Sequence, residues 1–348
     1  MARLGWKLTV AIVVTLLILP RVVLADGSAA ATLSVLAAPV ERVAADTGAS
    51  GPGTDGMNLA EGDRIRTTSG GMALITFLNG STVTVLPGSE VTVKQAQPGR
   101  GRGGIRILIT AGRVWARVVQ EAGGRASLTL ESNEYAASAH DGLIGAEQGG
   151  DGFVCWTRRG EVRLTDRSGL TDVVLLAGQR VWTHFGWTVT PEPFLASASV
   201  LEVTSSGPVL PLVRVPDGRL AAGFLTPDVE VNQVFGSLTK GGGSKWLVEV
   251  PGGQAGPYTL ILTGRATGSF IVNVSGRYAG KTVFRQEIAG VIRQGEQLVT
   301  TITPDVKGSD PQTARVVTAR VEDLRVWEGA EPAVVVVSPS VIRGMSEN

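Results

Sequence analysis

The stretch EGDRIRTTSGGMALITFLNGSTVTVLPGSEVTV, residues 61–93, alternates apolar side chains with small polar ones along most of its length. Successive side chains of a β-strand point to opposite faces, so this alternation predicts strands with one buried face. Asn79–Gly80 is a strong signal for a hairpin turn, and Pro87–Ser89 predicts the next turn. The stretch therefore predicts paired strands, and it has no histidine, cysteine or tryptophan that could perform chemistry.

The same pattern continues through the following hundred residues. Two sets of side chains, each expected to share one strand face, flank the turn at Ala111–Arg113; they are Ile105, Ile107 and Ile109 before it, and Val114, Ala116 and Val118 after it. The chain also contains 46 glycines and 17 prolines, which favour turns, and much valine and threonine, which favour strands. The sequence therefore predicts an all-β protein in which short strands form a twisted β-roll or sandwich.

A length of 348 residues suggests two domains. We expect a first β domain over residues 26–187 and a connector over 188–206, where Pro191 and Pro193 precede a run of small polar residues. A second β-sandwich is predicted over 207–329, followed by a terminal strand and tail over 330–348. Within the second domain, Val248–Gly276 predicts two strands joined by a glycine turn, as in a hairpin.

The N-terminus has the features of a secretory signal peptide. Arg3 and Lys7 precede an apolar run from Leu8 to Leu19, and Val23–Ala25 supplies small residues for cleavage. The alternative is an uncleaved anchor, but an apolar run of about twelve residues is short for a hydrocarbon core about 30 Å thick. We therefore expect cleavage after Ala25, no integral membrane span after it, and an extracytoplasmic location: periplasmic, cell-wall associated or secreted.

The charge balance argues against a nucleic-acid partner. The whole chain has a formal charge of +1, and removal of the three basic residues in segment 1–25 changes this to −2. Such a balance gives no basic footprint for nucleic acid. Cys155 is the single cysteine, and its apolar neighbours predict a buried side chain and not a reactive thiol. With two isolated histidines besides, the sequence offers no zinc spacing and no cofactor motif.

Acidic residues gather in the glycine-rich segment after His140. Asp141, Glu147 and Asp151 could supply oxygen ligands for calcium, although their spacing fits no known calcium loop, and the sequence leaves this site open. They could also serve as an acid pair for hydrolysis. No nucleophile motif accompanies the His140–Asp141 pair, so we predict no catalytic residue and keep Asp141 as a ligand-binding candidate.

Tryptophans supply the remaining candidates. Four of the seven, at positions 115, 156, 182 and 187, fall in the first predicted domain. They could form an aromatic platform for sugar or peptide, or fill the core. Within the segment VWTHFGW we expect Trp182, His184 and Trp187 to be exposed and to bind a ligand.

The segment Leu59–Val91 resembles the core of FecR-type domains, in which a Gly-Asp turn and a threonine-ending strand precede further strands and turns. The later segments Ile107–Val118, Gly160–Asp166 and Val173–Thr183 resemble the successive repeats of the same family, so the resemblance covers about residues 30–187. More weakly, Val248–Gly276 is similar to pre-peptidase C-terminal modules. The first resemblance implies a FecR-like β-roll or sandwich outside the cytoplasm.

FecR-type domains are best known from envelope sensors that signal to a cytoplasmic sigma factor. At most seven residues precede the apolar run here, so we expect no cytoplasmic anti-sigma region. The sequence favours a non-enzymatic binding, sensing or envelope-structural protein whose partner is an envelope protein or a cell-wall or extracellular glycan. The alternative is a secreted hydrolase acting on carbohydrate or peptide through scattered carboxylates. The ligand and the oligomeric state stay open.

Overall fold

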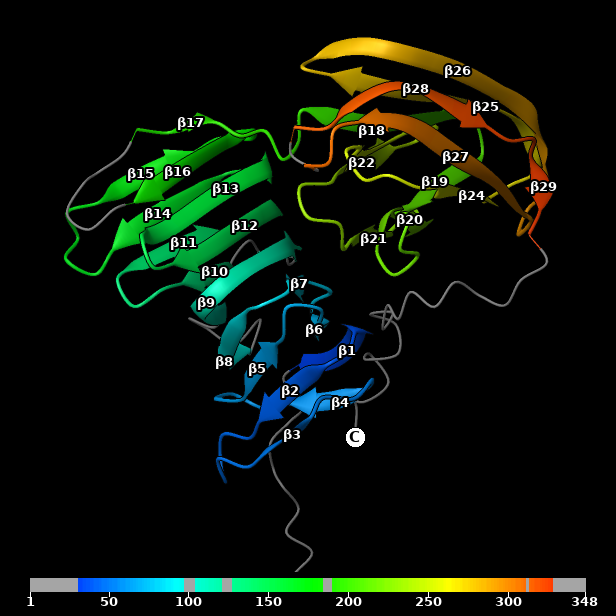
Figure 1. Cartoon of the computed structure of the whole chain (residues 1–348). Coiled ribbons are helices and arrows are strands. Elements are labelled where there is room, and N and C mark those ends of the chain that lie inside the picture. Colours follow the sequence, from blue (N-terminus) through cyan, green and yellow to red (C-terminus); the bar gives the residue numbers. More distant parts are fainter. Residues whose placement is uncertain (1–30, 97–103, 121–126, 184–189, 311–312, 328–348) are drawn as a thin grey trace, which may run out of the picture.

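The computed structural model describes residues 31–96, 104–120, 127–183, 190–310 and 313–327, and within these ranges every regular element is a β-strand. Two β domains lie side by side, the first in the blue to green part of the chain and the second in the green to red part (Figure 1). The predicted all-β class is confirmed. Within the described ranges we find no helical segment of the length and apolarity that a membrane crossing requires. The proposed signal peptide and the predicted terminal strand lie outside these ranges.

The first domain is a sandwich of two layers that share one long strand, β9 (Ile105–Val118). We call the layers sheet A and sheet B. Sheet A contains the second half of β9 with β1 (Ala31–Ala37), β4 (Met57–Leu59), β6 (Met72–Phe77), β7 (Thr82–Val85), β12 (Gly142–Gly149), β13 (Gly152–Gly160), β16 (Gln179–Thr183) and β17 (Glu192–Pro193). Sheet B contains the first half of β9 with β2 (Val40–Val43), β3 (Ser50–Pro52), β5 (Arg64–Thr67), β8 (Glu90–Ala96), β10 (Leu128–Glu131), β11 (Tyr135–Ala139), β14 (Val162–Asp166) and β15 (Asp172–Leu175).

Strand β9 passes from sheet B to sheet A at a bend. Gly112 has φ of 83° there, a conformation that glycine adopts without strain, and a Cβ at this position would lie 2.6 Å from the Cα of Ser89. The bend changes which positions of the strand face the core. Before it, the odd-numbered Ile105, Ile107 and Ile109 point inward from sheet B; after it, the even-numbered Val114, Ala116 and Val118 point inward from sheet A. The two predicted faces are therefore correct, although the two predicted strands are one continuous strand.

The residues behind the family resemblance hold this fold together. Asp63 is completely buried and accepts hydrogen bonds from the Arg42 guanidinium at 2.9 and 3.0 Å and from the amides of Ala45 and Ala60, both at 2.9 Å. Thr67 Oγ1 donates to the carbonyl of Leu86 at 2.6 Å and accepts from the amide of Ser89 at 2.9 Å. A buried carboxylate needs such partners, so Asp63 and Thr67 of this motif have structural roles.

The second domain is a sandwich of a five-stranded and a seven-stranded sheet around its own apolar core. The five-stranded sheet has the order β22 (Leu238–Gly242), β23 (Lys245–Pro251), β18 (Ser199–Ser206), β25 (Gly268–Tyr278) and β26 (Lys281–Ile292). The seven-stranded sheet has the order β21 (Val229–Asn232), β20 (Ala221–Thr226), β19 (Val209–Arg214), β24 (Tyr258–Gly264), β27 (Gln297–Lys307) and β28 (Arg315–Val321), with β29 (Arg325–Val326) also paired to β27.

Two sequence predictions about this domain need correction. The connector predicted over 188–206 is too long, because Ser199–Ser206 forms β18, the central strand of the five-stranded sheet, with Leu201 and Val203 in the core. The two strands predicted within Val248–Gly276 exist as β24 and β25 but do not form a hairpin. They belong to opposite sheets, because the chain crosses the sandwich between Gly264 and Gly268.

Candidate functional site

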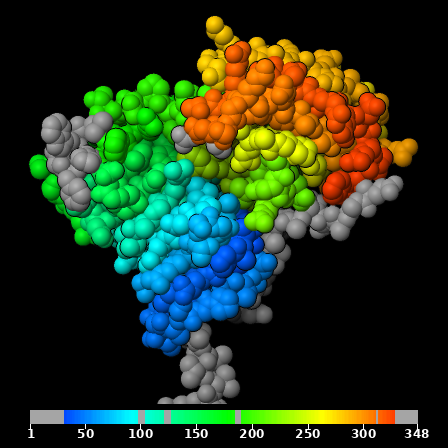
Figure 2. All heavy atoms as spheres, viewed as in Figure 1, coloured from blue at the N-terminus to red at the C-terminus, as the bar shows by residue number. Residues whose placement is uncertain are grey.

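The outer face of sheet A is covered by the second domain, and this junction is the principal site of the molecule. In the space-filling view the cyan and green part of the first domain abuts the yellow-green part of the second (Figure 2). Trp115 on β9 and Trp156 on β13 point out of the first domain into this junction, and both are buried there. Two of the tryptophans proposed for a ligand platform therefore pack against the second domain.

A glycine between the two indoles makes the packing possible. Gly145 on β12 lies directly opposite both Trp115 and Trp156 in the strand register, so the three share one row of sheet A. A Cβ at position 145 would lie 2.2 Å from Nε1 of Trp156 and 2.9 Å from Cε3 of Trp115. The two rings thus occupy the space that any other residue at position 145 would need.

Phe235 of the second domain inserts into a socket of aromatic rings. Its ring centroid lies 5.6 Å from that of Trp115 and 5.3 Å from that of Trp156, both edge to face. Phe194 stacks on Trp156 at 5.6 Å with an interplanar angle of 19° and closes the socket, 6.3 Å from Phe235. The guanidinium of Arg113 lies 5.0 Å from the Phe235 centroid. Such pairs stabilise contacts by about 0.5–1.5 kcal/mol each beyond area burial.

A β-bulge aims two consecutive arginines at the second domain. In the pairing of β12 with β13, Leu143 lies opposite Arg159 and Ile144 opposite Thr157, which leaves Arg158 as an extra residue. Neighbouring residues of a regular strand point to opposite faces, but a bulge redirects one of them. Arg158 binds the Glu249 carboxylate at 2.7 Å, while Arg159 reaches Glu230.

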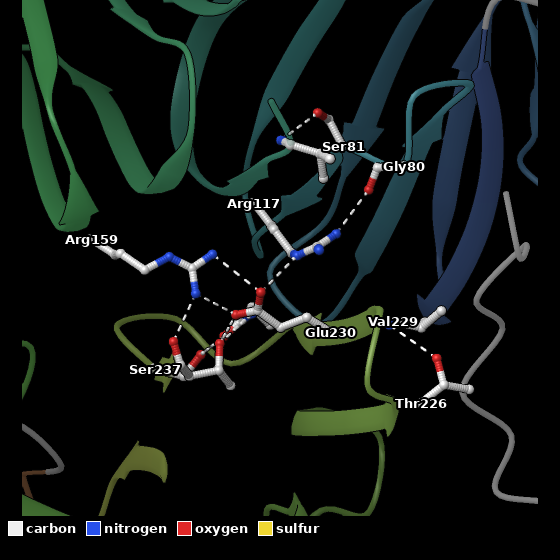
Figure 3. Close-up of polar contacts among 11 residues, drawn as sticks. Gly80, Ser81, Arg117, Arg159, Thr226, Val229, Glu230 and Ser237 are labelled. Carbon is white, nitrogen blue, oxygen red and sulfur yellow. Dashed lines mark hydrogen bonds and ion pairs between the residues drawn. The ribbon is translucent and has the colours of Figure 1, made fainter. Parts of the chain in front are cut away.

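Glu230 on β21 is the centre of the polar half of the junction (Figure 3). Arg159 donates two hydrogen bonds to its carboxylate, from Nη1 to Oε1 at 2.7 Å and from Nη2 to Oε2 at 3.1 Å. Arg117, on β9, donates from Nε to Oε2 at 3.2 Å. Asn232 Nδ2 donates to Oε1 at 2.8 Å, and Thr239 Oγ1 also contacts the carboxylate. The arginines of this network belong to the first domain and the glutamate to the second.

The arginines keep Glu230 ionised. Burial alone would raise the pKa of this carboxyl, but the hydrogen bonds and charge of Arg159, with the charge of Arg117, outweigh burial and lower the pKa below its usual value. Paired charges of this kind fix the orientation of the two domains more than they add to affinity.

A small cavity lies beside Glu230. It has a volume of about 70 Å³ and is lined from both domains, with Thr76 and Arg117 on one side and Asp228 and Gln233 on the other. Thr76 Oγ1 and Gln233 Nε2 are buried and have no hydrogen-bond partner within the described residues. A cavity of this size, whose mostly apolar lining includes these two polar groups, fits about two water molecules and is far smaller than a drug-sized ligand site.

The ligand-binding residues predicted from the sequence are not all placed by the structure. Trp182 on β16 is 47% exposed and lies opposite Val154 of β13, on the junction face of sheet A. Asp141 is exposed and lies just before β12, at the opposite end of that strand from Glu147, which shares the row of Trp182. His184 and Trp187 lie outside the described residues. Trp182 and Asp141 are therefore not parts of one site.

The acidic residues of the glycine-rich segment do not converge. Asp141 precedes β12, whereas Glu147 lies near its far end and Asp151 lies in the turn to β13, so the extended strand separates Asp141 from Glu147 by about 20 Å. Glu147 is paired with Arg113 at 2.9 Å. In the part of the chain that the structure describes, no group of three histidine, cysteine or acidic side chains could hold a metal ion. Asp141, Glu147 and Asp151 therefore do not come together as the calcium site considered for this segment.

Cys155 is buried in the core of the first domain, as predicted. Burial raises the pKa of its thiol to about 12, so almost no thiolate is present at neutral pH.

The residues that sequence analysis missed are Phe235, Glu230 and the bulge arginines. Each acts on a partner 70 to 120 positions away, as the separations of 71 for Arg159–Glu230 and 113 for Arg117–Glu230 show. The short-range periodicity of a sequence cannot reveal contacts between residues so far apart in the chain. The single available signal was Gly145, a glycine at the centre of an apolar strand, which often marks a close approach.

The comparisons with known proteins found a family match within the first domain and two similar solved structures. Residues 63–163 match the family model described as FecR protein, so the first domain contains a FecR domain, as the resemblance predicted. Two crystal structures of a protein described as an anti-sigma factor from Parabacteroides distasonis ATCC 8503 are similar at 11% and 10% identity. Each match has a TM-score of 0.33 and covers 37% of this chain and 59% of the other. No curated protein matches the sequence.

Proposed function

We propose that this chain is a non-enzymatic extracytoplasmic protein that binds or senses a partner through its FecR domain. The FecR match over residues 63–163 and the apolar N-terminal run, Leu8–Leu19, support this proposal. The partner is an envelope protein or a cell-wall or extracellular glycan. Determination of the mature N-terminus by mass spectrometry, together with cell fractionation, tests the location. An uncleaved chain in the cytoplasm would contradict it.

One observation supports a binding surface on the FecR domain more than any other. The row of sheet A next to the Trp115–Trp156 row consists, in register, of Arg113, Glu147, Val154 and Trp182, and we call this row the binding strip. Arg113 borders the second domain through Phe235, whereas Trp182 at the other end is exposed. A strip with an ion pair, an apolar residue and an exposed indole suits peptide or sugar, because indole offers both an apolar face and a polar N–H.

The hydrolase alternative is supported less. Paired carboxylates of glycosidases lie about 5–9.5 Å apart, whereas Asp141 and Glu147 are separated by roughly twice that distance or more along β12. Glu147 is also held by Arg113. A panel of glycan and peptide substrates is the test, and turnover that disappears on Glu147→Gln would favour this alternative over our proposal.

The binding strip is tested with matched surface variants. Purified chain is incubated with cell-wall polysaccharide and, in parallel, with envelope extract, and bound protein is measured. We expect Trp182→Ala to reduce binding at least tenfold, since removal of a central aromatic contact commonly has effects of this size. Leu170→Ala is the control, because Leu170 is 87% exposed and lies in the β14–β15 turn, outside the binding strip. Equal binding by both variants and the unaltered chain would contradict the strip as the site.

A further inference from the structure

Strand β26 is the outermost strand of the five-stranded sheet, and within the described residues no strand pairs with its outer edge. It is 12 residues long and, among the residues described, pairs with β25 alone. Figure 1 shows it at the top of the second domain. Along its outer edge every second residue presents an unpaired N–H and C=O, which is a template for another strand.

Burial along β26 is incomplete. Phe284 and Ile288 point inward and pack against the core of the second domain, yet both are only half-buried. The other strands of this sheet have fully buried inward residues, such as Val272 and Val274 on β25. A further strand next to β26 would remove more apolar surface of Phe284 and Ile288 from water.

The sequence of β26 is self-complementary in the antiparallel direction. When Gln286 lies opposite Gln286 of a second copy, Arg285 lies opposite the second copy's Glu287 and Phe284 lies opposite the second copy's Ile288. The two-fold symmetry repeats each of these pairs. Since residues directly opposite share one face of a sheet, the apolar pairs fall on the core side and the charged pairs on the outer side.

The charged side chains at this edge are available for such pairing. Glu287 and Arg285 are both exposed, and Arg285 donates hydrogen bonds to the uncharged Asn273 Oδ1, at 3.2 and 3.1 Å. Charges on an edge strand often oppose association, but here opposite charges are arranged symmetrically about the centre.

We propose that two copies of this chain associate edge to edge through β26, antiparallel about Gln286, so that their five-stranded sheets join into one sheet of ten strands. The FecR domain packs at the opposite side of this sheet, where β22 and β23 supply Leu238, Thr239 and Glu249 to the junction. The dimer therefore leaves the junction undisturbed and the binding strip accessible, and it presents two binding strips to one partner. Two linked sites can raise avidity for a polymeric partner.

Charge exchange tests the register. The chain without its N-terminal apolar run, residues 26–348, is studied by sedimentation equilibrium over a range of concentrations. We expect a dimer, and we expect Glu287→Arg or Arg285→Glu alone to raise the dimer dissociation constant about tenfold or more, because two opposite-charge pairs become like-charge pairs. An equimolar mixture of the two variants restores every pair and should form a mixed dimer of about the original affinity. A dimer dissociation constant that neither substitution changes would overturn the proposal.

An engineered disulfide provides an independent readout. Gln286→Cys places two cysteines directly opposite across the two-fold axis, at a separation that a disulfide can span. Oxidation should yield a covalent dimer, and the buried Cys155 takes no part. Thr318→Cys, at an exposed position on β28, is the control and should give none. A monomeric full chain overturns the proposal, and dimerisation only after removal of residues 328–348 would assign the edge to the C-terminal segment.

Discussion

The two outer faces of the first domain differ in what covers them. Sheet A presents arginines and two tryptophans packed around a glycine, and the indoles and the arginines meet side chains of the second domain. Sheet B presents ion pairs within its own strands. Arg163–Asp172 is exposed at both groups, whereas Arg66–Glu90 and Arg106–Glu131 are partly buried at the glutamate. The charges of the two faces therefore have different roles. Arginines of sheet A find their glutamates in the other domain, whereas those of sheet B find them on neighbouring strands.

The largest expected effect is that of Phe235→Ala. Removal of the ring empties the socket between Trp115, Trp156 and Phe194, so we expect the free energy of unfolding to fall by about 3–5 kcal/mol. Urea unfolding followed by tryptophan fluorescence measures it. Phe235→Leu fills part of the socket and should cost less than half as much. An unchanged midpoint in Phe235→Ala would show that the socket does not couple the domains.

Glu230→Gln should have the next largest effect. It leaves Arg159 and Arg117 facing a neutral amide in a mostly buried site, and we expect a loss of about 2–3 kcal/mol. A double-mutant cycle with Arg159→Met separates the pair energy from other losses. A coupling energy near zero would contradict the account.

The pH dependence of stability follows from the same carboxylate. The pKa of Glu230 is lower in the folded chain than its ordinary value of 4.5, so the unfolded chain binds a proton at higher pH than the folded chain does. The contribution of Glu230 is therefore complete above pH 4.5 and is lost as pH falls through the folded pKa. Thermal unfolding between pH 3 and 6 should show this loss, and Glu230→Gln should show less of it. Identical slopes in the two proteins would refute the assignment.

Gly145→Ala tests the close approach of the two indoles. The new Cβ meets the Trp156 ring, so we expect a loss of about 1–3 kcal/mol from displaced side chains. Gly149→Ala is the matched control, since it lies on the same strand and its Cβ would meet nothing closer than 4.0 Å. Equal effects of the two substitutions on urea unfolding would show that position 145 is not a contact.

A substitution in the ion pairs of sheet B should change the stability of the chain least. Asp172→Asn removes the exposed ion pair with Arg163, in which water already competes for both groups. We expect the urea midpoint to stay unchanged within error. A clear shift, comparable with that of Glu230→Gln, would mean that sheet B also carries an interface and would remove the contrast between the two faces.

Much of the fold could be predicted from the sequence, because alternation and turn residues act locally. The Asn79–Gly80 turn and the inward faces of β9 were correct for this reason. The central strand β18 was missed, although Leu201 and Val203 alternate with polar residues, because the preceding prolines and small residues favoured a connector.

The junction could not be predicted in the same way. Trp115 and Trp156 were recognised as aromatic residues on strand faces, but a face that meets another domain has the same pattern as one that meets a ligand. The choice depends on Phe235, which lies 79 positions beyond Trp156 and has no periodic relation to it.

The most direct test of the central claim, that the socket and the Glu230 network join the two domains into one unit, is scanning calorimetry of the chain from residue 26 to 348. We expect one cooperative transition whose calorimetric and van't Hoff enthalpies agree. Two separate transitions, unaffected by Phe235→Ala, would contradict it.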